Sequence, residues 1–305
     1  MKIVVSGSTG LIGSALTPAL TARGHTVVPL VRRRPASGEK AIAWDPEGAT
    51  IDRAGLERER PDVVIHLAGE NVFGRWWPAK KQRIRDSRVN GTRLVCDAIA
   101  GLHRSPATLL AASAIGYYGD RGEEEVTEQS PPGEDFLAQV ARDWEAATTP
   151  ATRAGIRVVN LRFGVVLTPA AGALAKMLPA FRLGLGGPVA SGNQYLSWIA
   201  RDDAINAIIH VLTTSAVRGP VNITAPTPVT NRDFAKALGK VLGRPAVVTV
   251  PAFALRLAFG TESAALLQSG QRVQPARLLA SGFRFSFDTV EPALRHLLAA
   301  PESRR

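Results

Sequence analysis

The sequence predicts an α/β fold of the Rossmann type, in which a doubly wound parallel sheet is followed by a smaller, mostly helical C-terminal lobe. Short apolar runs alternate with helical stretches, a pattern typical of parallel strands covered by helices on both faces. A glycine-rich turn follows the first apolar run and opens the first helical stretch. The chain has 305 residues, which is enough for one large domain and a smaller lobe.

The expected strands of the large domain are short runs rich in valine, isoleucine and leucine. Five such runs occupy residues 3–5, 26–31, 62–68, 108–113 and 157–162. The helix after the first strand is expected to end at Gly24, because glycine is common just past a helix. Further helical patterns lie near residues 80–100 and 135–154. Strands that alternate with helices in this way form parallel βαβ units.

The pattern changes after about residue 165. Asp202 and Asp203 are expected to cap a helix that runs through His210, and residues 221–223 to form a further strand. A proline-rich stretch follows at 226–228, and the rest is mostly helical. We therefore expect a Rossmann-type domain over residues 1–225, whose 166–199 loop contributes to a substrate pocket, and a small substrate-side domain over residues 226–305.

The composition is that of an ordinary globular protein, and the basic residues are expected to lie on a solvent-exposed surface. The net charge is +11, but the arginines are scattered. The densest basic cluster, residues 80–88, leads into a helical pattern and lacks interleaved aromatic residues, as on a solvent-exposed helix face. No apolar run approaches the ~18 residues of a membrane span, and the N-terminus lacks the apolar stretch of a signal peptide. The single cysteine, Cys96, cannot form an internal disulfide. We expect a cytoplasmic monomer or homodimer without nucleic-acid or membrane partners.

The glycine-rich turn has the spacing of a dinucleotide site. Gly7, Gly10 and Gly13 stand between the first strand and the first helix in a GxxGxxG pattern. In such a turn one glycine allows the sharp bend, one lets the backbone approach a pyrophosphate, and one allows the helix to pack on the strand. The helix N-terminus then offers free N–H groups to the phosphates.

The end of the second strand discriminates between the two nicotinamide cofactors. Sites for NAD usually place an acidic residue there to bind the ribose 2′-hydroxyl. Here the strand is followed by Arg32, Arg33 and Arg34, with no acid before Glu39. Because guanidinium groups bind phosphate through charge-assisted hydrogen bonds, the sequence predicts NADP(H).

Several blocks of the sequence resemble a known superfamily. The segments 6–13 and 66–69, and Ser113 at a strand end, resemble the extended short-chain dehydrogenase/reductases. Further blocks resemble the atypical "epimerase family" branch, whose members carry a C-terminal domain of unknown function. These blocks are residues 67–71, 114–119, 144–147, 181–188 and 270–275.

The resemblance implies an NADP-binding site built from loops at the strand ends. Arg32 would bind the 2′-phosphate, and Val165 would lie beside the nicotinamide. Arg88 stands where relatives usually carry an asparagine, which suggests a charged contact near the cofactor. The expected cofactor-binding residues are Gly7, Thr9, Gly10, Leu11, Ile12, Gly13, Arg32, Arg33, Leu67, Ala68, Gly69, Arg88 and Val165.

The catalytic pair of the superfamily is missing from its usual place. Most members use a Tyr-x-x-x-Lys pair on a helix, and alignment on Trp144 puts Leu137 and Ala141 at those positions. No tyrosine lies between Tyr118 and Tyr195, and no lysine between Lys81 and Lys176. The remaining catalytic candidates are Ser113, Tyr117 and Tyr118. The five histidines show no metal-ligand spacing, so no metal site is expected.

Two functions of different classes remain open. The first is an NADP(H)-binding oxidoreductase or epimerase-like protein that acts on an unidentified small molecule. The second is an NADP(H)-binding sensor or assembly protein without turnover, which the missing catalytic pair favours. The side chains of Trp76, Trp77, Gln194, Tyr195 and Trp198 are candidates for the substrate pocket, with packing as the alternative role.

Overall fold

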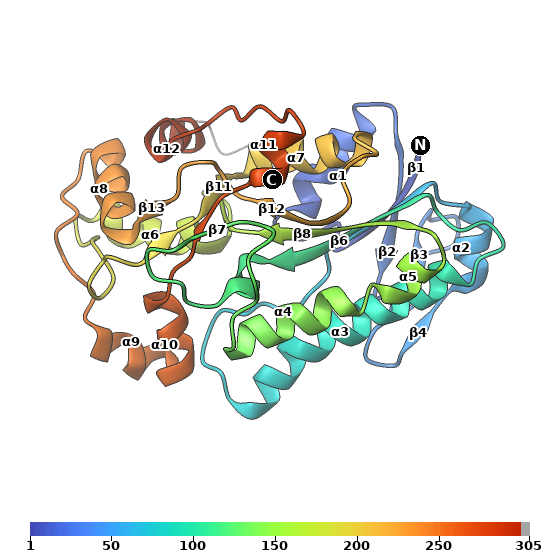
Figure 1. Ribbon diagram of the computed structural model, residues 1–305, viewed down its shortest axis with the longest axis horizontal. Coiled ribbons are helices and arrows are strands. Elements are labelled where there is room, and N and C mark those ends of the chain that lie inside the picture. The colour runs from blue at the N-terminus through green and yellow to red at the C-terminus, as the bar shows by residue number, and fades with distance from the viewer. Residues whose placement is uncertain (300–305) are drawn as a thin grey trace.

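The computed structural model describes residues 1–299 and is built around an eight-stranded sheet with helices on both faces (Figure 1). The strand order is β12-β8-β6-β5-β1-β2-β3-β4, and all neighbours are parallel except β3 and β4. The strands are β1 (Lys2–Ser6), β2 (Thr26–Val31), β3 (Ile42–Asp45), β4 (Thr50–Ile51), β5 (Val63–His66), β6 (Thr108–Ala114), β8 (Arg157–Phe163) and β12 (Gly219–Ile223). The predicted Rossmann-type fold is confirmed.

The chain direction across the sheet reverses next to β1. From β1 the chain proceeds outward through β2 and β3 on one side, and through β5, β6, β8 and β12 on the other. In sheets of this kind ligands bind beyond the carboxyl ends of the strands, at the point of reversal. The turn after β1 and the turn after β5 therefore flank the expected binding crevice.

Two hydrophobic cores account for the apolar strands. Ile3 and Val5 face a core shared with α1 (Gly13–Thr21) and α7 (Arg201–Thr213). Val4 faces the opposite core, to which α2 (Arg53–Glu59), α3 (Pro78–Ala100) and α5 (Thr149–Arg153) contribute. Because successive strand residues point to opposite faces, a strand buried on both sides must be apolar throughout.

The C-terminal part is joined to the first part by small sheets and a third core. β13 (Val229–Thr230) pairs with β10 (Tyr195–Leu196), and β14 (Arg272–Val273) pairs with β7 (Glu125–Val126). The third core lies between α6, α8 and α12. The remaining elements are η1 (Ile115–Tyr118), α4 (Phe136–Ala146), β9 (Val165–Leu167), α6 (Gly172–Arg182), β11 (Trp198–Ala200), α8 (Asn231–Leu242), α9 (Ala252–Phe259), α10 (Thr261–Gln268), α11 (Ala276–Ala280) and α12 (Val290–Ala299).

The predicted strands and most helices are confirmed to within a few residues, with two corrections. The helix expected over 135–154 is two helices, α4 and α5, and Pro150 lies in the first turn of the second. Asp202 and Asp203 do not cap α7, because the capping residue is Ala200 and makes no side-chain cap. Instead the buried Asp203 carboxylate accepts hydrogen bonds from the N–H groups of Ser286 and Phe287, which fastens the approach to α12 onto α7.

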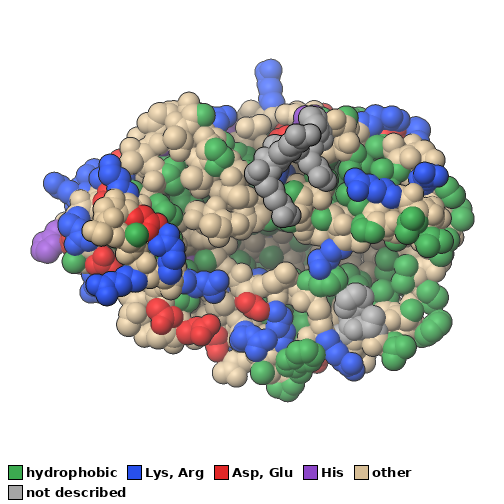
Figure 2. All heavy atoms as spheres, turned by 180° about the vertical axis from the view of Figure 1, so that it is seen from behind, with side chains coloured by type: hydrophobic (Ala, Val, Ile, Leu, Met, Phe, Trp, Pro, Cys, Tyr) green, Lys and Arg blue, Asp and Glu red, His purple; other side chains and the backbone are tan. Residues whose placement is uncertain are grey.

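The molecular surface shows no dominant basic face in the view of Figure 2. Lysine and arginine side chains are spread over that face and are interspersed with acidic groups (Figure 2). Within residues 1–299, no helix combines the length and the apolar character needed to cross a membrane.

Candidate functional site

The turn between β1 and α1 is shaped by its glycines. Gly7 has a φ of +69° and packs against the Leu67 carbonyl group, so a Cβ there would lie 2.9 Å from that carbon. A Cβ on Gly13 would overlap the Gly7 carbonyl oxygen. The turn closes through a 3.0 Å hydrogen bond from the Gly10 N–H to the same oxygen. Only glycines let strand, turn and helix approach this closely.

This turn leaves hydrogen-bond donors available to a ligand. Helix α1 has no side-chain cap and no acidic residue in its first turn. The N–H groups of Leu11, Ile12 and Gly13 have no acceptor among residues 1–299. Thr9 is exposed at the tip of the turn. Free N–H groups at a helix N-terminus favour an anion such as a pyrophosphate.

The three arginines after β2 border a cavity of about 370 Å³. Arg33 donates a 2.8 Å hydrogen bond to Glu39, and hydrogen bonds from Arg33 and from the Ala36 N–H lower the pKa of Glu39 to about 2. Arg32 is exposed and has no ion-pair partner among the described residues. The carboxylate of Glu39 is therefore bound by Arg33. The guanidinium of Arg32 remains available to bind a ligand.

The rest of this cavity escaped the sequence analysis. Besides the arginines it is lined by residues of β3, β4 and the start of α2, among them Trp44 and Asp45 at the end of β3. The Asp45 carboxylate accepts a hydrogen bond from the Glu47 N–H. They could have been anticipated only by recognising residues 42–45 as a strand next to β2, which a four-residue run does not indicate.

The turn after β5 lies against the glycine turn. The N–H groups of Leu67 and Ala68 donate to the Ser6 hydroxyl, at 3.1 and 3.3 Å. That hydroxyl lies 2.7 Å from Nδ1 of the fully buried His66. The predicted cofactor residues of the two turns are thus brought together through Ser6 and His66, which the sequence analysis did not assign to the site.

Arg88 lies beneath the same turn. Its guanidinium carbon would be 3.5 Å from a Cβ on Gly69, and it stacks over Trp144 at 5.0 Å. Burial lowers the pKa of Arg88 to about 10, against a weaker opposing effect of Glu70. No carboxylate forms an ion pair with it within residues 1–299. A half-buried cation without a carboxylate partner suits an anionic ligand.

Val165 lies at the start of β9, outside the two turns that hold the other predicted cofactor residues. Its N–H donates a 2.9 Å hydrogen bond to the Ser197 carbonyl, and its side chain is half-buried. Gly164 before it lies so close to Ser197 and Thr224 that a Cβ would clash with both. The backbone beside Val165 therefore comes near the carboxyl ends of β8 and β12.

Ser113 belongs to a polar row that crosses three strands. In register, Ser113 of β6 lies beside Arg162 of β8, and Arg162 lies beside Asn222 of β12. All three are buried. The Ser113 hydroxyl donates a 2.7 Å hydrogen bond to Glu145 of α4, so it points into the helix layer.

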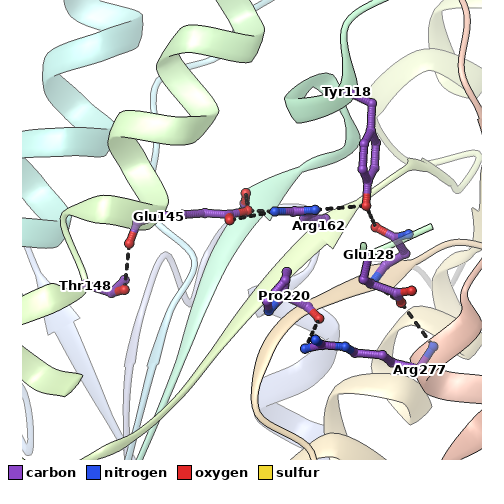
Figure 3. Close-up of polar contacts among 9 residues, drawn as sticks. Tyr118, Glu128, Glu145, Thr148, Arg162, Pro220 and Arg277 are labelled. Carbon is purple, nitrogen blue, oxygen red and sulfur yellow. Dashed lines mark hydrogen bonds and ion pairs between the residues drawn. The ribbon is translucent and has the colours of Figure 1, made fainter. Parts of the chain in front are cut away.

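Arg162 and Glu145 form the centre of this row (Figure 3). The guanidinium binds the carboxylate through two hydrogen bonds, at 2.7 and 2.8 Å. Burial alone would lower the pKa of Arg162, but the Glu145 carboxylate raises it. Neither residue was among the predicted site residues. A usable signal was the arginine within the apolar run 157–163, since a charge inside a buried strand needs a partner.

The two tyrosines of η1 differ in their environment. The fully buried Tyr118 hydroxyl accepts a 3.0 Å hydrogen bond from Arg162 and donates to Asn222 at 2.7 Å. Burial raises the pKa of Tyr118 to about 12. Tyr117 is half-buried, and its ring lies under the Arg162 guanidinium at 3.5 Å. The candidate catalytic hydroxyls of Ser113 and Tyr118 are both held by hydrogen bonds within the polar row. The hydroxyl of Tyr117 makes no hydrogen bond to the residues of this row.

The helix positions usually held by the tyrosine and lysine pair are apolar. Leu137 of α4 lies beside Gly116. A Cβ added to Gly116 would be 3.6 Å from the Leu137 Cβ. Ala141, one turn later, is buried. A cavity of about 560 Å³ opens next to Leu137 and is bounded by α3, α4, α9 and α10. Trp76 lines it, but no residue of the 166–199 segment does.

Of the other candidate pocket residues, Trp77 is exposed, whereas Trp198 and Gln194 make internal contacts. Trp198 is fully buried and donates to the Thr227 carbonyl. The Gln194 amide donates to the carbonyls of Val189 and Leu267. Within residues 1–299, no group of three or more His, Cys, Asp or Glu side chains is placed to hold a metal ion.

Comparison with known proteins agrees with this arrangement. Residues 3–224 match the NAD dependent epimerase/dehydratase family, and residues 250–297 match a domain of unknown function, DUF1731. An epimerase family protein of Mycobacterium bovis is 43% identical over 300 residues, covering 98% of both chains.

Solved structures show the same likeness. The human epimerase family protein SDR39U1, crystallised with NADPH, is 35% identical with a TM-score of 0.89, covering 98% of this chain and 99% of that chain. The Thermus thermophilus UDP-glucose 4-epimerase is 21% identical with a TM-score of 0.74, covering 98% of each chain, and shares the fold. This chain therefore belongs to the NAD dependent epimerase/dehydratase family, among the epimerase family proteins of the SDR39U1 branch.

Proposed function

We propose that this protein binds NADP(H) and acts as an oxidoreductase or epimerase-like enzyme on a small molecule. The observation that carries the proposal is the glycine turn with free N–H groups at Leu11, Ile12 and Gly13, next to an exposed Arg32. The structure of the human relative holds NADPH, which supports the same cofactor here.

The residues of the crevice fit such a dinucleotide. The N–H groups of the glycine turn would hold the pyrophosphate, and Arg32 would hold the 2′-phosphate. Leu67, Ala68 and Gly69 would border the adenosine and ribose, with Arg88 as a nearby positive charge and Val165 on the nicotinamide side. When bound, the cofactor supplies or accepts a hydride.

The cofactor preference is tested at Arg32. One charge-assisted contact to the 2′-phosphate corresponds to roughly 10- to 100-fold in affinity, so calorimetry should show that NADPH binds more tightly than NADH by about that factor. Arg32→Asp should remove most of the difference. Arg153→Asp, an equal charge change on the exposed end of α5, should leave it intact. Equal affinities of the native protein for the two cofactors would refute the assignment.

The same geometry favours substrates that need little help with proton transfer. Leu137 and Ala141 provide neither a phenol nor a cation, and general acid–base catalysis is typically worth about 10²–10⁴-fold in rate. The hydroxyls of Ser113 and Tyr118 are engaged by Glu145 and by Arg162 with Asn222. Activated alkenes and quinone-like carbonyls therefore suit this site better than simple secondary alcohols.

A substrate screen tests the reaction class. We expect NADPH consumption with quinone-like carbonyls or activated alkenes, and slow oxidation of simple alcohols with NADP⁺. Tyr117→Phe should lower the rate more than Ser113→Ala or Tyr118→Phe, by up to about 10²–10⁴-fold if Tyr117 donates the proton. Tyr195→Phe serves as the matched control, since Tyr195 lies in β10 and takes no part in the polar row around Arg162. Rapid alcohol oxidation governed by one base of near-neutral pKa would contradict this class, and binding without turnover would favour a cofactor sensor.

A further inference from the structure

The cavity beside Leu137 has mostly apolar walls. Its volume of about 560 Å³ is within the range of pockets that hold small organic ligands. Trp76 and Phe136 form one side, with their rings edge to face at 5.6 Å. Leu137 and Leu266 contribute from α4 and α10. A largely apolar molecule fits these walls better than a polyhydroxylated one.

Charged side chains around the cavity are almost all engaged by protein groups. Three carboxylates line it, those of Asp120, Asp135 and Glu262, and two cations, Lys81 and Arg256. Glu262 forms an ion pair with Lys81 at 2.9 Å. Asp120 accepts from the Gly270 N–H at 3.1 Å, and Asp135 caps α4 by accepting from the Ala138 N–H at 2.9 Å.

The guanidinium of Arg256 is the exception. It projects from α9 at the rim of the cavity and has no hydrogen-bond or ion-pair partner among the described residues. Arg75 lies across the junction between α9 and α10, where its Nε would be 3.3 Å from a Cβ on Gly260. Arg75 likewise has no acceptor within residues 1–299. The guanidinium groups of Arg256 and Arg75 are therefore positive charges that no carboxylate among the described residues pairs with.

We infer that the substrate of this cavity is a monoanion, a carboxylate on a largely apolar body, and not a sugar nucleotide. The inference rests on the proposed function, because it takes the cavity as the substrate site. Arg256 is the one arginine in the cavity lining, and its guanidinium matches one carboxylate through paired hydrogen bonds. A diphosphate would bring further negative charge next to Asp120 and Asp135, whose carboxylates accept only backbone hydrogen bonds, and like charges at short range repel. The ligand would thus differ from that of the UDP-glucose 4-epimerase, with which this chain shares only the fold.

Matched probes test the inference on the full-length, NADPH-loaded protein. Calorimetry would compare 2-naphthylacetate with 2-naphthylacetamide, which have the same shape and differ in charge, and with UDP-glucose. We expect the acid to bind at least about tenfold more tightly than the amide, and UDP-glucose to bind more weakly than the acid. In Arg256→Gln the affinities for the acid and the amide should differ by no more than about threefold, whereas Arg256→Lys should retain part of the preference for the acid. Arg153→Gln should retain all of it.

Two sets of results separate this inference from the proposed function. Equal binding of acid and amide, preference for UDP-glucose, or a preference that survives Arg256→Gln would overturn the monoanion assignment while leaving NADPH binding as it is. Failure to bind NADPH would refute the proposed function. In that case the affinities of the cofactor-free protein for the acid and the amide would still test the monoanion inference. No binding of either naphthyl probe to any form would also overturn the inference.

Discussion

At the scale of single residues, the protonation of His66 is coupled to folding. The ring is fully buried, and its Nδ1 lies 2.7 Å from the Ser6 hydroxyl. That hydroxyl already accepts hydrogen bonds from the N–H groups of Leu67 and Ala68, so its proton points to Nδ1. Nδ1 is then an acceptor, which requires a neutral ring. Burial lowers the pKa of His66 to about 4.

This coupling predicts acid sensitivity. The folded pKa lies below the unfolded value of about 6.5, so the unfolded chain binds more protons and acid favours unfolding. Between pH 7.5 and pH 5, His66 should lower the free energy of unfolding by about 2 kcal/mol, measured by urea denaturation. His66→Gln should flatten that pH dependence whatever its effect on stability at pH 7.5. His103→Gln, at a side chain that is 96% exposed, is the control. An unchanged slope in His66→Gln would assign the sensitivity to other groups.

The Arg162 and Glu145 pair illustrates a second residue-scale effect. A guanidinium in the middle of a sheet is costly to bury alone, and removing one partner of such a pair typically costs about 3–5 kcal/mol. Glu145, Tyr118 and the ring of Tyr117 surround it. The pair holds η1 against α4, and η1 carries the strand-end tyrosines. Its contribution to the site is therefore the position of Tyr117.

At the scale of elements, the turn between β1 and α1 combines packing with ligand binding. α1 can start directly after the turn because Gly13 has no side chain to meet the Gly7 carbonyl. The lack of a side-chain cap leaves the first N–H groups of α1 unsatisfied, which costs stability unless solvent or a ligand binds them. The same feature thus favours binding of an anion.

Gly13→Ala tests this element. The added methyl group must displace α1 or the turn, so we expect a loss of about 1–3 kcal/mol in the free energy of unfolding and at least about tenfold weaker NADPH binding. Chemical denaturation and calorimetry would measure the two effects. Ser14→Ala, an exposed neighbour on the same helix, should change neither by much. Wild-type affinity in Gly13→Ala would show that the turn tolerates a side chain and that its glycines are not required for binding.

At the scale of the whole molecule, the C-terminal part is integrated with the Rossmann-type part. The Ser197 hydroxyl donates to the Gln271 carbonyl and accepts from the Val273 N–H. The third core contains Trp198 together with Phe234 and Leu294. α10 meets α3 through the ion pair of Lys81 with Glu262. In Figure 1, α9 and α10 lie at one end of the sheet, next to α4.

Such a shared core predicts one cooperative transition. Differential scanning calorimetry and tryptophan fluorescence should give coincident unfolding curves, and NADPH should shift both to higher temperature by the same amount. A chain that ends at residue 225 should fail to fold, because Trp198 and its neighbours would be exposed. Two separate transitions, only one of them sensitive to NADPH, would contradict this expectation.

By itself the sequence determined the features that depend on neighbouring residues. The apolar runs predicted the main strands, because a strand buried on both faces must be apolar along its length. Gly7, Gly10 and Gly13 predicted the dinucleotide turn, because its bend and close packing exclude side chains. Two- and three-residue strands such as β7 and β14 were missed, because so short a run has no pattern of its own.

Only the tertiary structure decided which of these residues meet and what their side chains face. Ser113 was a catalytic candidate from its position at a strand end, yet its hydroxyl points to Glu145, 32 residues away. Glu262 meets Lys81 across 181 residues of sequence, and this contact forms part of the wall of the cavity. Neither pairing follows from local pattern, because such distant residues become neighbours only when the sheet order and the helix packing have been established.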